Sequence, residues 1–175
     1  MSELLFNELP RPTFRWLRVN HTVSSLAGED TAVQSIAVEA NKDILSPLPV
    51  GTALLDGNYE GANKEAVHVL VEKAEGYAIN VPPKAKEVVG IRIDANARVA
   101  NRFQFIVGEG AELEVQFYVT GSGDALTNVS YLNEYDVKEA GKVVVKKVNL
   151  LPEHVQHIEH RYTKLEEKAD VEYIN

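Results

Sequence analysis

The sequence contains no cysteine, and this absence excludes more chemistry than any other feature of its composition. Disulfides, thiolate nucleophiles and cysteine-ligated zinc or iron–sulfur sites are all ruled out within the chain. Any cluster chemistry in which the protein takes part must therefore draw its sulfur ligands from another subunit. We expect the chain to bind no cofactor on its own.

Long apolar runs and an excess of positive charge are lacking as well. No segment approaches the roughly 20 apolar residues that span a bilayer, and no apolar run follows a basic stretch at the amino terminus. The 18 Lys and Arg residues face 26 Asp and Glu residues, which gives a net charge of −8. Nucleic acids and anionic membranes select concentrated positive charge, so neither is expected as a partner. These features predict a cytoplasmic protein.

What the sequence has in abundance is the alternation of apolar and polar residues. From about residue 66 onward apolar residues recur with a period of two, which is typical of strands with one buried face. By this rule Val67, Val69 and Val71 predict a strand. The best helical candidate, residues 153–168, fits strand alternation nearly as well. The sequence therefore predicts a mostly β protein.

A repeat of nearly constant length underlies these strands. Residues 107–115, 137–145 and 165–173 can be superimposed at offsets of 30 and then 28 residues, and residues 81–86 form a weaker copy 26 residues before the first. Each full copy has an apolar residue, a Glu two positions later, small residues and then an apolar alternation. Such a period without intervening helices predicts a β-solenoid. A β-sandwich, the alternative, has no reason to keep the period constant.

The organisation changes at about residue 65. Residues 1–65 are expected to form an irregular N-terminal segment, extended at residues 14–19 and rich in turns from residue 41 onward, which packs on or leads into the solenoid. Residues 66–175 are expected to form the coils. The last repeat stops in mid-strand without a polar cap. This predicts either that the native protein continues beyond Asn175 or that another chain covers the open edge.

The best candidates for a functional site are His154, His157 and His160, with Glu153 and Glu159 among them. Imidazole and carboxylate form a sound set of metal ligands, and on a helix this spacing places all three imidazoles near one face. On a strand, His154 and His160 would point one way and His157 the other. A metal site and a set of exposed or interface histidines both stay open at this point.

Two other sets of side chains are assigned to structural roles. Lys142, Lys146 and Lys147 are expected on a solvated strand face. Aromatic residues in strand registers are expected to lie in the core, and these are Trp16, Phe103, Phe105, Phe117, Tyr118 and Tyr173.

Four stretches resemble the SufB/SufD family of iron–sulfur cluster assembly proteins, and its SufD-like members more than SufB. They are LPRPTFRWLRVN (9–20), GYAINVPPK (76–84), NRFQFIVGEGAELEV (101–115) and HIEHRYTKLEEKADVEYI (157–174). Together they run nearly the whole length of the chain and match the amino-terminal part of a family member. The resemblance implies a right-handed parallel β-helix, in agreement with the repeat.

The resemblance also implies a function. In the family, SufB and SufD pair through their β-helices, and a carboxyl-terminal helical region binds the ATPase SufC. SufB-type members carry cysteine implicated in building the nascent cluster, so the lack of cysteine favours a SufD-like role. The sequence ends before any helical SufC-docking region, which leaves coupling to SufC open. We therefore expect a non-enzymatic scaffold with SufB-like and SufC-like partners, a homodimer through the β-helix edge as a second pairing mode, and an iron–sulfur cluster at a complex interface.

The alternative hypothesis is a small metal-dependent cupin-like enzyme that uses His154, His157 and His160. Cupin strands are equally rich in Val, Tyr and Glu, and the cupin fold is also all-β. The sequence lacks a tight His-x-His pair with a Glu a few residues on, which favours the scaffold.

Overall fold

The computed structural model describes residues 36–55, 59, 64–96, 99–121 and 127–175, and the backbone of two short paired strands, β1 (Leu4–Phe6) and β2 (Thr22–Ser24). The expected extended segment at residues 14–19, with Trp16, lies outside the described residues. The other elements are β3 (Ile36–Glu39), β4 (Leu45–Leu48), α1 (Lys64–Lys73), β5 (Gly76–Val81), β6 (Lys86–Asp94), β7 (Val99–Val107), β8 (Glu112–Thr120), β9 (Thr127–Val137), β10 (Lys142–Leu150), β11 (Val155–Leu165) and β12 (Asp170–Ile174).

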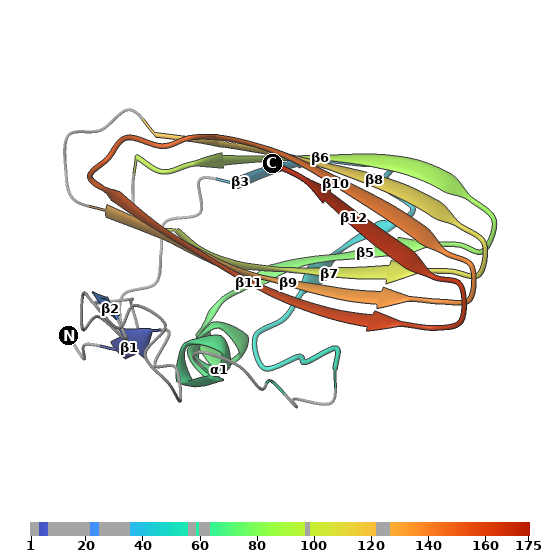
Figure 1. Ribbon diagram of the computed structural model, residues 1–175, viewed down its shortest axis with the longest axis horizontal. Helices are drawn as coiled ribbons and strands as arrows, with labels where there is room; N and C mark the ends of the chain where they lie inside the picture. Colours follow the sequence, from blue (N-terminus) through green and yellow to red (C-terminus); the bar gives the residue numbers. More distant parts are fainter. Residues whose placement is uncertain are drawn as a thin grey trace, which may run out of the picture.

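The long strands wind as a β-solenoid, in which each coil adds one strand to each of two facing sheets (Figure 1). The first sheet has the order β12-β10-β8-β6-β3 and the second the order β11-β9-β7-β5-β4. All neighbours pair in parallel except β3 and β4, which pair in the antiparallel sense with β6 and β5. Parallel sheets distinguish this solenoid from the antiparallel double sheet of cupins.

The strand register confirms the sequence repeat. Val81 pairs with Val107, Val107 with Val137, and Val137 with Leu165. The offsets of 26, 30 and 28 residues are therefore the lengths of successive coils. Because the register is parallel, equivalent residues of each coil stack in columns, and one column of side chains can be followed through the whole solenoid.

A column of residues with a left-handed backbone conformation forms the corner between the second sheet and the first. Its members occupy the same position in every coil and are Lys84 (φ 62°), Gly110 (φ 61°), Ala140 (φ 54°) and Lys168 (φ 59°). The N–H groups of Lys84, Gly110 and Ala140 each donate over 2.9 Å to a carbonyl of the following coil. Adjacent coils are thus joined through their corners as well as through their strands.

The core lies between the two sheets. Phe103, Phe105 and Phe117 are buried there, as expected, and Tyr173 packs against the same cluster while half-buried. The expectation for Tyr118 is wrong, because Tyr118 is 45% exposed. It follows Phe117 in β8, and consecutive strand residues point to opposite faces.

The expected strand at Val67–Val71 is wrong, because these residues belong to α1. Val67, Leu70, Val71 and Ala74 are buried together, and their spacing of three, four and seven residues is that of one helical face. The period-two pattern counted Val69 instead, which is only half-buried. α1 packs against the outer face of the second sheet, at β7 and β9 (Figure 1). No helix in the described part of the chain is long and apolar enough to cross a membrane.

Candidate functional site

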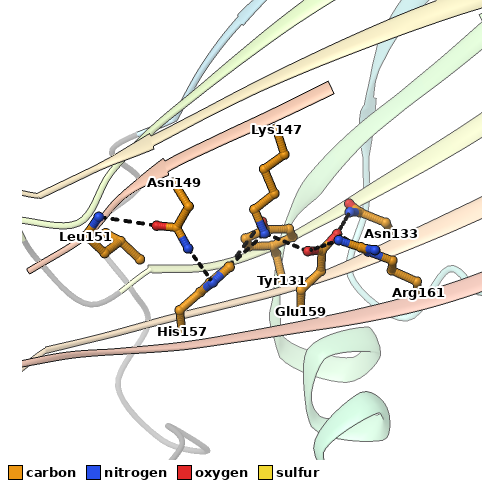
Figure 2. A network of polar contacts seen from close by, with 8 residues as sticks. All are labelled: Tyr131, Asn133, Lys147, Asn149, Leu151, His157, Glu159 and Arg161. Atoms are coloured by element: carbon orange, nitrogen blue, oxygen red, sulfur yellow. Dashed lines mark hydrogen bonds and ion pairs between the residues drawn. The ribbon is translucent and has the colours of Figure 1, made fainter. Parts of the chain in front are cut away.

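The interior of the solenoid changes from apolar to polar toward its last coils. In the column that passes through Phe117 of β8, the next coil carries Lys147. In the column that passes through Tyr131 of β9, the next coil carries Glu159. Figure 2 shows the side chains of β10 pointing toward those of β11, so that polar groups from both sheets meet inside the solenoid. We call the seven residues involved the interior cluster, and they are Tyr131, Asn133, Lys147, Asn149, His157, Glu159 and Arg161.

The carboxylate of Glu159 is the centre of the interior cluster. Lys147 Nζ lies 2.7 Å from its Oε2, and Arg161 binds both oxygens through Nε (2.7 Å) and Nη2 (2.8 Å). Asn133 Nδ2 donates to Oε1 over 2.8 Å. The side chains of Lys147 and Glu159 are 7% and 8% exposed, whereas that of Arg161 is 31% exposed. The carboxylate thus accepts four hydrogen bonds, which matches its full capacity.

His157 extends this cluster along the sheet (Figure 2). Its Nδ1 lies 3.2 Å from Asn149 Nδ2, and its Nε2 lies 3.1 Å from the Tyr131 hydroxyl and 3.4 Å from Lys147 Nζ. Asn149 Nδ2 and Lys147 Nζ can only donate, and a neutral ring accepts at one nitrogen only, so the roles of Nδ1 and Nε2 depend on the tautomer. Burial and then the nearby Lys147 ammonium lower the pKa of His157 to about 4, so the ring is neutral at neutral pH.

The charges of the central groups follow from their contacts. Burial alone would raise the pKa of Glu159, but hydrogen bonds from Arg161 and Lys147 outweigh it and hold this pKa below its ordinary value. Burial lowers the pKa of Lys147, and the hydrogen bond to Glu159 opposes that shift. Glu159 is therefore an ionised carboxylate whose lone pairs are all occupied. Such a group is suited to fixing the geometry of the last coils rather than to accepting a proton from a substrate.

The three candidate histidines are not brought together. His154 lies in the turn before β11, His157 points into the interior, and His160 points to the outer face of β11. Burial lowers the pKa of His160 to about 4. Because residues three apart on a strand face opposite sides, His157 and His160 cannot reach one ion together. Throughout the described ranges, no group of three or more His, Cys, Asp or Glu side chains is arranged to hold a metal ion.

Sequence reasoning found His157 and Glu159 but missed Lys147, Asn133 and Arg161. Lys147 was expected on a solvated face with Lys142 and Lys146, and that expectation is wrong for Lys147 alone. Lys146 and Lys147 are adjacent in β10, so their side chains must point to opposite faces. The repeat offset between β8 and β10 also places Lys147 in the column of Phe117, which is the signal that could have identified it.

A second polar cluster lies on the outer face of the second sheet and anchors the preceding chain. The buried guanidinium of Arg102 donates to the carbonyls of Pro49 (2.7 Å), Thr52 (2.5 Å) and Ala74 (3.1 Å). The buried Glu134 accepts hydrogen bonds from Tyr59, Gln104 and the Leu54 N–H. These contacts tie the segment from Pro49 to Leu54, Tyr59 and the end of α1 to β7 and β9.

Comparison with protein-family models, with curated proteins and with solved structures gave no match.

Proposed function

We propose that this chain is a SufD-like scaffold subunit of an iron–sulfur cluster assembly complex, and that it acts by pairing with other proteins rather than as an enzyme. The observation that carries the proposal is the position of β11 and β12. Each is the last strand of its parallel sheet, with a strand partner on one side only among the residues that the structure describes. Unpaired strand edges are templates for association, either with a further coil of the native protein or with another chain.

The direction of the backbone groups at these edges follows from the corner hydrogen bonds. The Asp170 N–H donates to the Gly141 carbonyl over 3.0 Å, so it points toward β10. Because successive peptide groups of a strand alternate in direction, the N–H groups of Val171 and Tyr173 point away from β10. The Glu166 N–H donates to the Val137 carbonyl in the same way, so the N–H group of Leu165 in β11 also points outward.

The two open edges belong to one coil, which makes them suitable for a single partner. A protein that presents two strands there would extend both sheets at once, through main-chain hydrogen bonds. Arg161 stacks over the Tyr173 ring at 4.4 Å in the same coil, and both side chains stay partly exposed. They supply side-chain contacts beside the strand edges.

The family resemblance supports the same assignment. Residues 76–84 cover β5 and its corner, residues 101–115 cover most of β7 with its corner and the start of β8, and residues 157–174 cover the coil formed by β11 and β12. Three of the four resembling stretches therefore fall on equivalent units of the solenoid, and the stretch at residues 9–20 lies outside the described residues. In the proposed complex a SufB-like subunit supplies the sulfur ligands of the cluster, a SufC-like ATPase completes the assembly, and the complex works in the cytoplasm.

Co-expression with SufB-like and SufC-like subunits from one genome tests this proposal. We expect the wild-type chain to co-purify with the SufB-like subunit. Val171→Pro should weaken that association, because it removes an outward N–H while the bonds of Asp170 and Glu172 to β10 remain. Glu172→Gln, on the same strand with its side chain facing solvent, is the matched control. A wild-type chain that binds neither subunit contradicts the proposal, and a homodimer that excludes the SufB-like subunit replaces it.

A further inference from the structure

The interior of the last coils carries an unbalanced charge. Among the inward-pointing side chains that the structure describes in β9, β10, β11 and β12, those charged at neutral pH are Lys147, Glu159 and Arg161. The neighbouring His157 is neutral, because burial and the Lys147 ammonium hold its pKa at about 4. Two cations therefore share one carboxylate, which leaves a single positive charge in excess between the two sheets (Figure 2).

Glu159 has no capacity left to bind a further donor. Its two oxygens already accept four hydrogen bonds, one each from Lys147 and Asn133 and two from Arg161. Arg161 uses Nε and Nη2 for these bonds, which leaves the N–H groups of Nη1 for another acceptor. The side chain of Arg161 is 31% exposed, compared with 7% for Lys147, so water reaches the excess charge chiefly at Arg161.

A strand that pairs with β11 would displace this water. β11 is the last strand of its sheet among the described residues, and Arg161 occupies the column of Asn133 in β9. An added strand would stack its own inward side chain on Arg161, in the same column. Burial of a charge without a counter-ion is strongly unfavourable, so an acidic side chain is favoured at that position. A second copy of the chain does not meet this need, because its last coil has the same excess of cations.

The residues near Arg161 indicate what else the added strand presents. Leu165 lies four residues further along the same face of β11, is 49% exposed and continues the apolar column of Val107 and Val137. Val171 of the facing strand β12 packs partly buried against the same core. A strand running parallel to β11 therefore fits with an acidic residue over Arg161 and an apolar residue four positions later.

We propose that the partner strand seated on β11 carries an inward-facing Asp or Glu that binds the guanidinium of Arg161. This inference rests on the proposed pairing with a SufB-like subunit, and it adds the chemistry that the partner must present. The partner carboxylate would accept hydrogen bonds from Nη1 and would balance the charge inside the joined solenoid. It would also favour the partner over a second copy of the chain, whose cations would repel those of the first.

The affinities of the full chain and its variants for the purified SufB-like subunit test the inference. Arg161→Met and Arg161→Lys both lose the two-point bond to Glu159, which keeps Lys147 and Asn133, but Arg161→Met alone loses the charge. We expect affinity to fall at least about tenfold in Arg161→Met and at most about threefold in Arg161→Lys. Lys164→Met removes a cation from the outer face of the same strand, and should bind as wild type does.

Carbodiimide coupling of the complex locates the acidic residue without relying on the folding of Arg161→Met. The reagent joins an amine to a carboxylate in contact with it, so the lysine introduced by Arg161→Lys should become linked to an Asp or Glu of the partner, as mapped by mass spectrometry. Wild type has a guanidinium at this position and should give no link there.

The outcomes separate this inference from the proposed function. If wild type binds the SufB-like subunit but Arg161→Met binds equally well or better, the inference is overturned while the pairing function stands. The same holds if the introduced lysine gives no link to the partner. A wild-type chain that does not bind the SufB-like subunit, or that pairs only with itself, contradicts both.

Discussion

Removal of Glu159 is expected to destabilise the protein far more than removal of its partner Lys147. In Lys147→Met the carboxylate keeps both bonds from Arg161 and the bond from Asn133, so it stays compensated. In Glu159→Leu two cations lose their shared anion, and Lys147, whose side chain is 7% exposed, is left as an uncompensated buried charge. The two substitutions break the same ion pair from opposite ends, so their comparison isolates the effect of an uncompensated buried charge.

The loss of unfolding free energy in each variant follows from how deeply the charged side chains are buried. Breaking a buried ion pair on one side costs about 3–5 kcal/mol, and we expect about 3 kcal/mol for Glu159→Leu, since the 31% exposed Arg161 can turn toward solvent. Lys147→Met loses one charged hydrogen bond and keeps its volume, at a cost of about 1 kcal/mol. The double variant removes both charges, so it should be about 2 kcal/mol more stable than the sum of the single effects predicts.

Urea unfolding followed by circular dichroism measures these differences. Glu112→Gln is the control, because Glu112 forms an ion pair of 2.8 Å with Lys86 at the surface, where the side chains are 50% and 75% exposed. That variant should be indistinguishable from wild type. Equal costs for Glu159→Leu and Lys147→Met, or additive effects in the double variant, would refute the reasoning.

Two further predictions concern the pH dependence of stability and the glycines at the corner between β7 and β8. The pKa of His157 is about 4 in the folded protein against about 6.5 when unfolded, so the unfolded state binds the proton first as pH falls. The contribution of His157 to stability is therefore fully present above about pH 6.5 and should decline toward pH 4, by at most about 3 kcal/mol. A His157→Leu variant whose urea midpoints at pH 7.5 and 4.5 differ as much as those of wild type would contradict this. Gly110→Ala places a side chain at φ 61° with its nearest contact at 3.8 Å, so it should lower the free energy of unfolding by about 1 kcal/mol. Gly108→Ala places a Cβ within 2.6 Å of Pro83 N, so it should lower the free energy of unfolding by more. Thermal or urea unfolding of the two variants shows which is less stable. A Gly110→Ala variant less stable than Gly108→Ala would show that the corner is not packed as described.

The solenoid could be predicted from the sequence because equivalent apolar residues recur at a nearly constant spacing along the chain. Parallel stacking places equivalent residues one coil apart, so Val107, Val137 and Leu165 occur at the offsets that the register later showed. α1 was missed because Val67, Val69 and Val71 satisfy a strand pattern. Its true face depends on Leu70 and Ala74, which complete the helical period.

The interior cluster was only partly predictable, because it depends on which face of each strand points inward. The spacing of His154, His157 and His160 is informative only once β11 is known to be a strand. A lysine next to another lysine is typical of solvated surface, and composition alone gives no reason to place Lys147 in the interior. Its ion partner Glu159 lies on the facing sheet, in the next coil, so the pair is a product of the fold.

Amide hydrogen exchange, followed by NMR with and without a SufB-like subunit, tests most directly whether this protein acts through its strand edges. In the isolated chain the outward N–H groups of Leu165, Val171 and Tyr173 should exchange quickly, while those of Asp170 and Glu172 are protected by β10. Pairing predicts that the three outward amides become protected in the complex. A complex in which they exchange as fast as in the free chain, or the failure of any complex to form, would contradict the account.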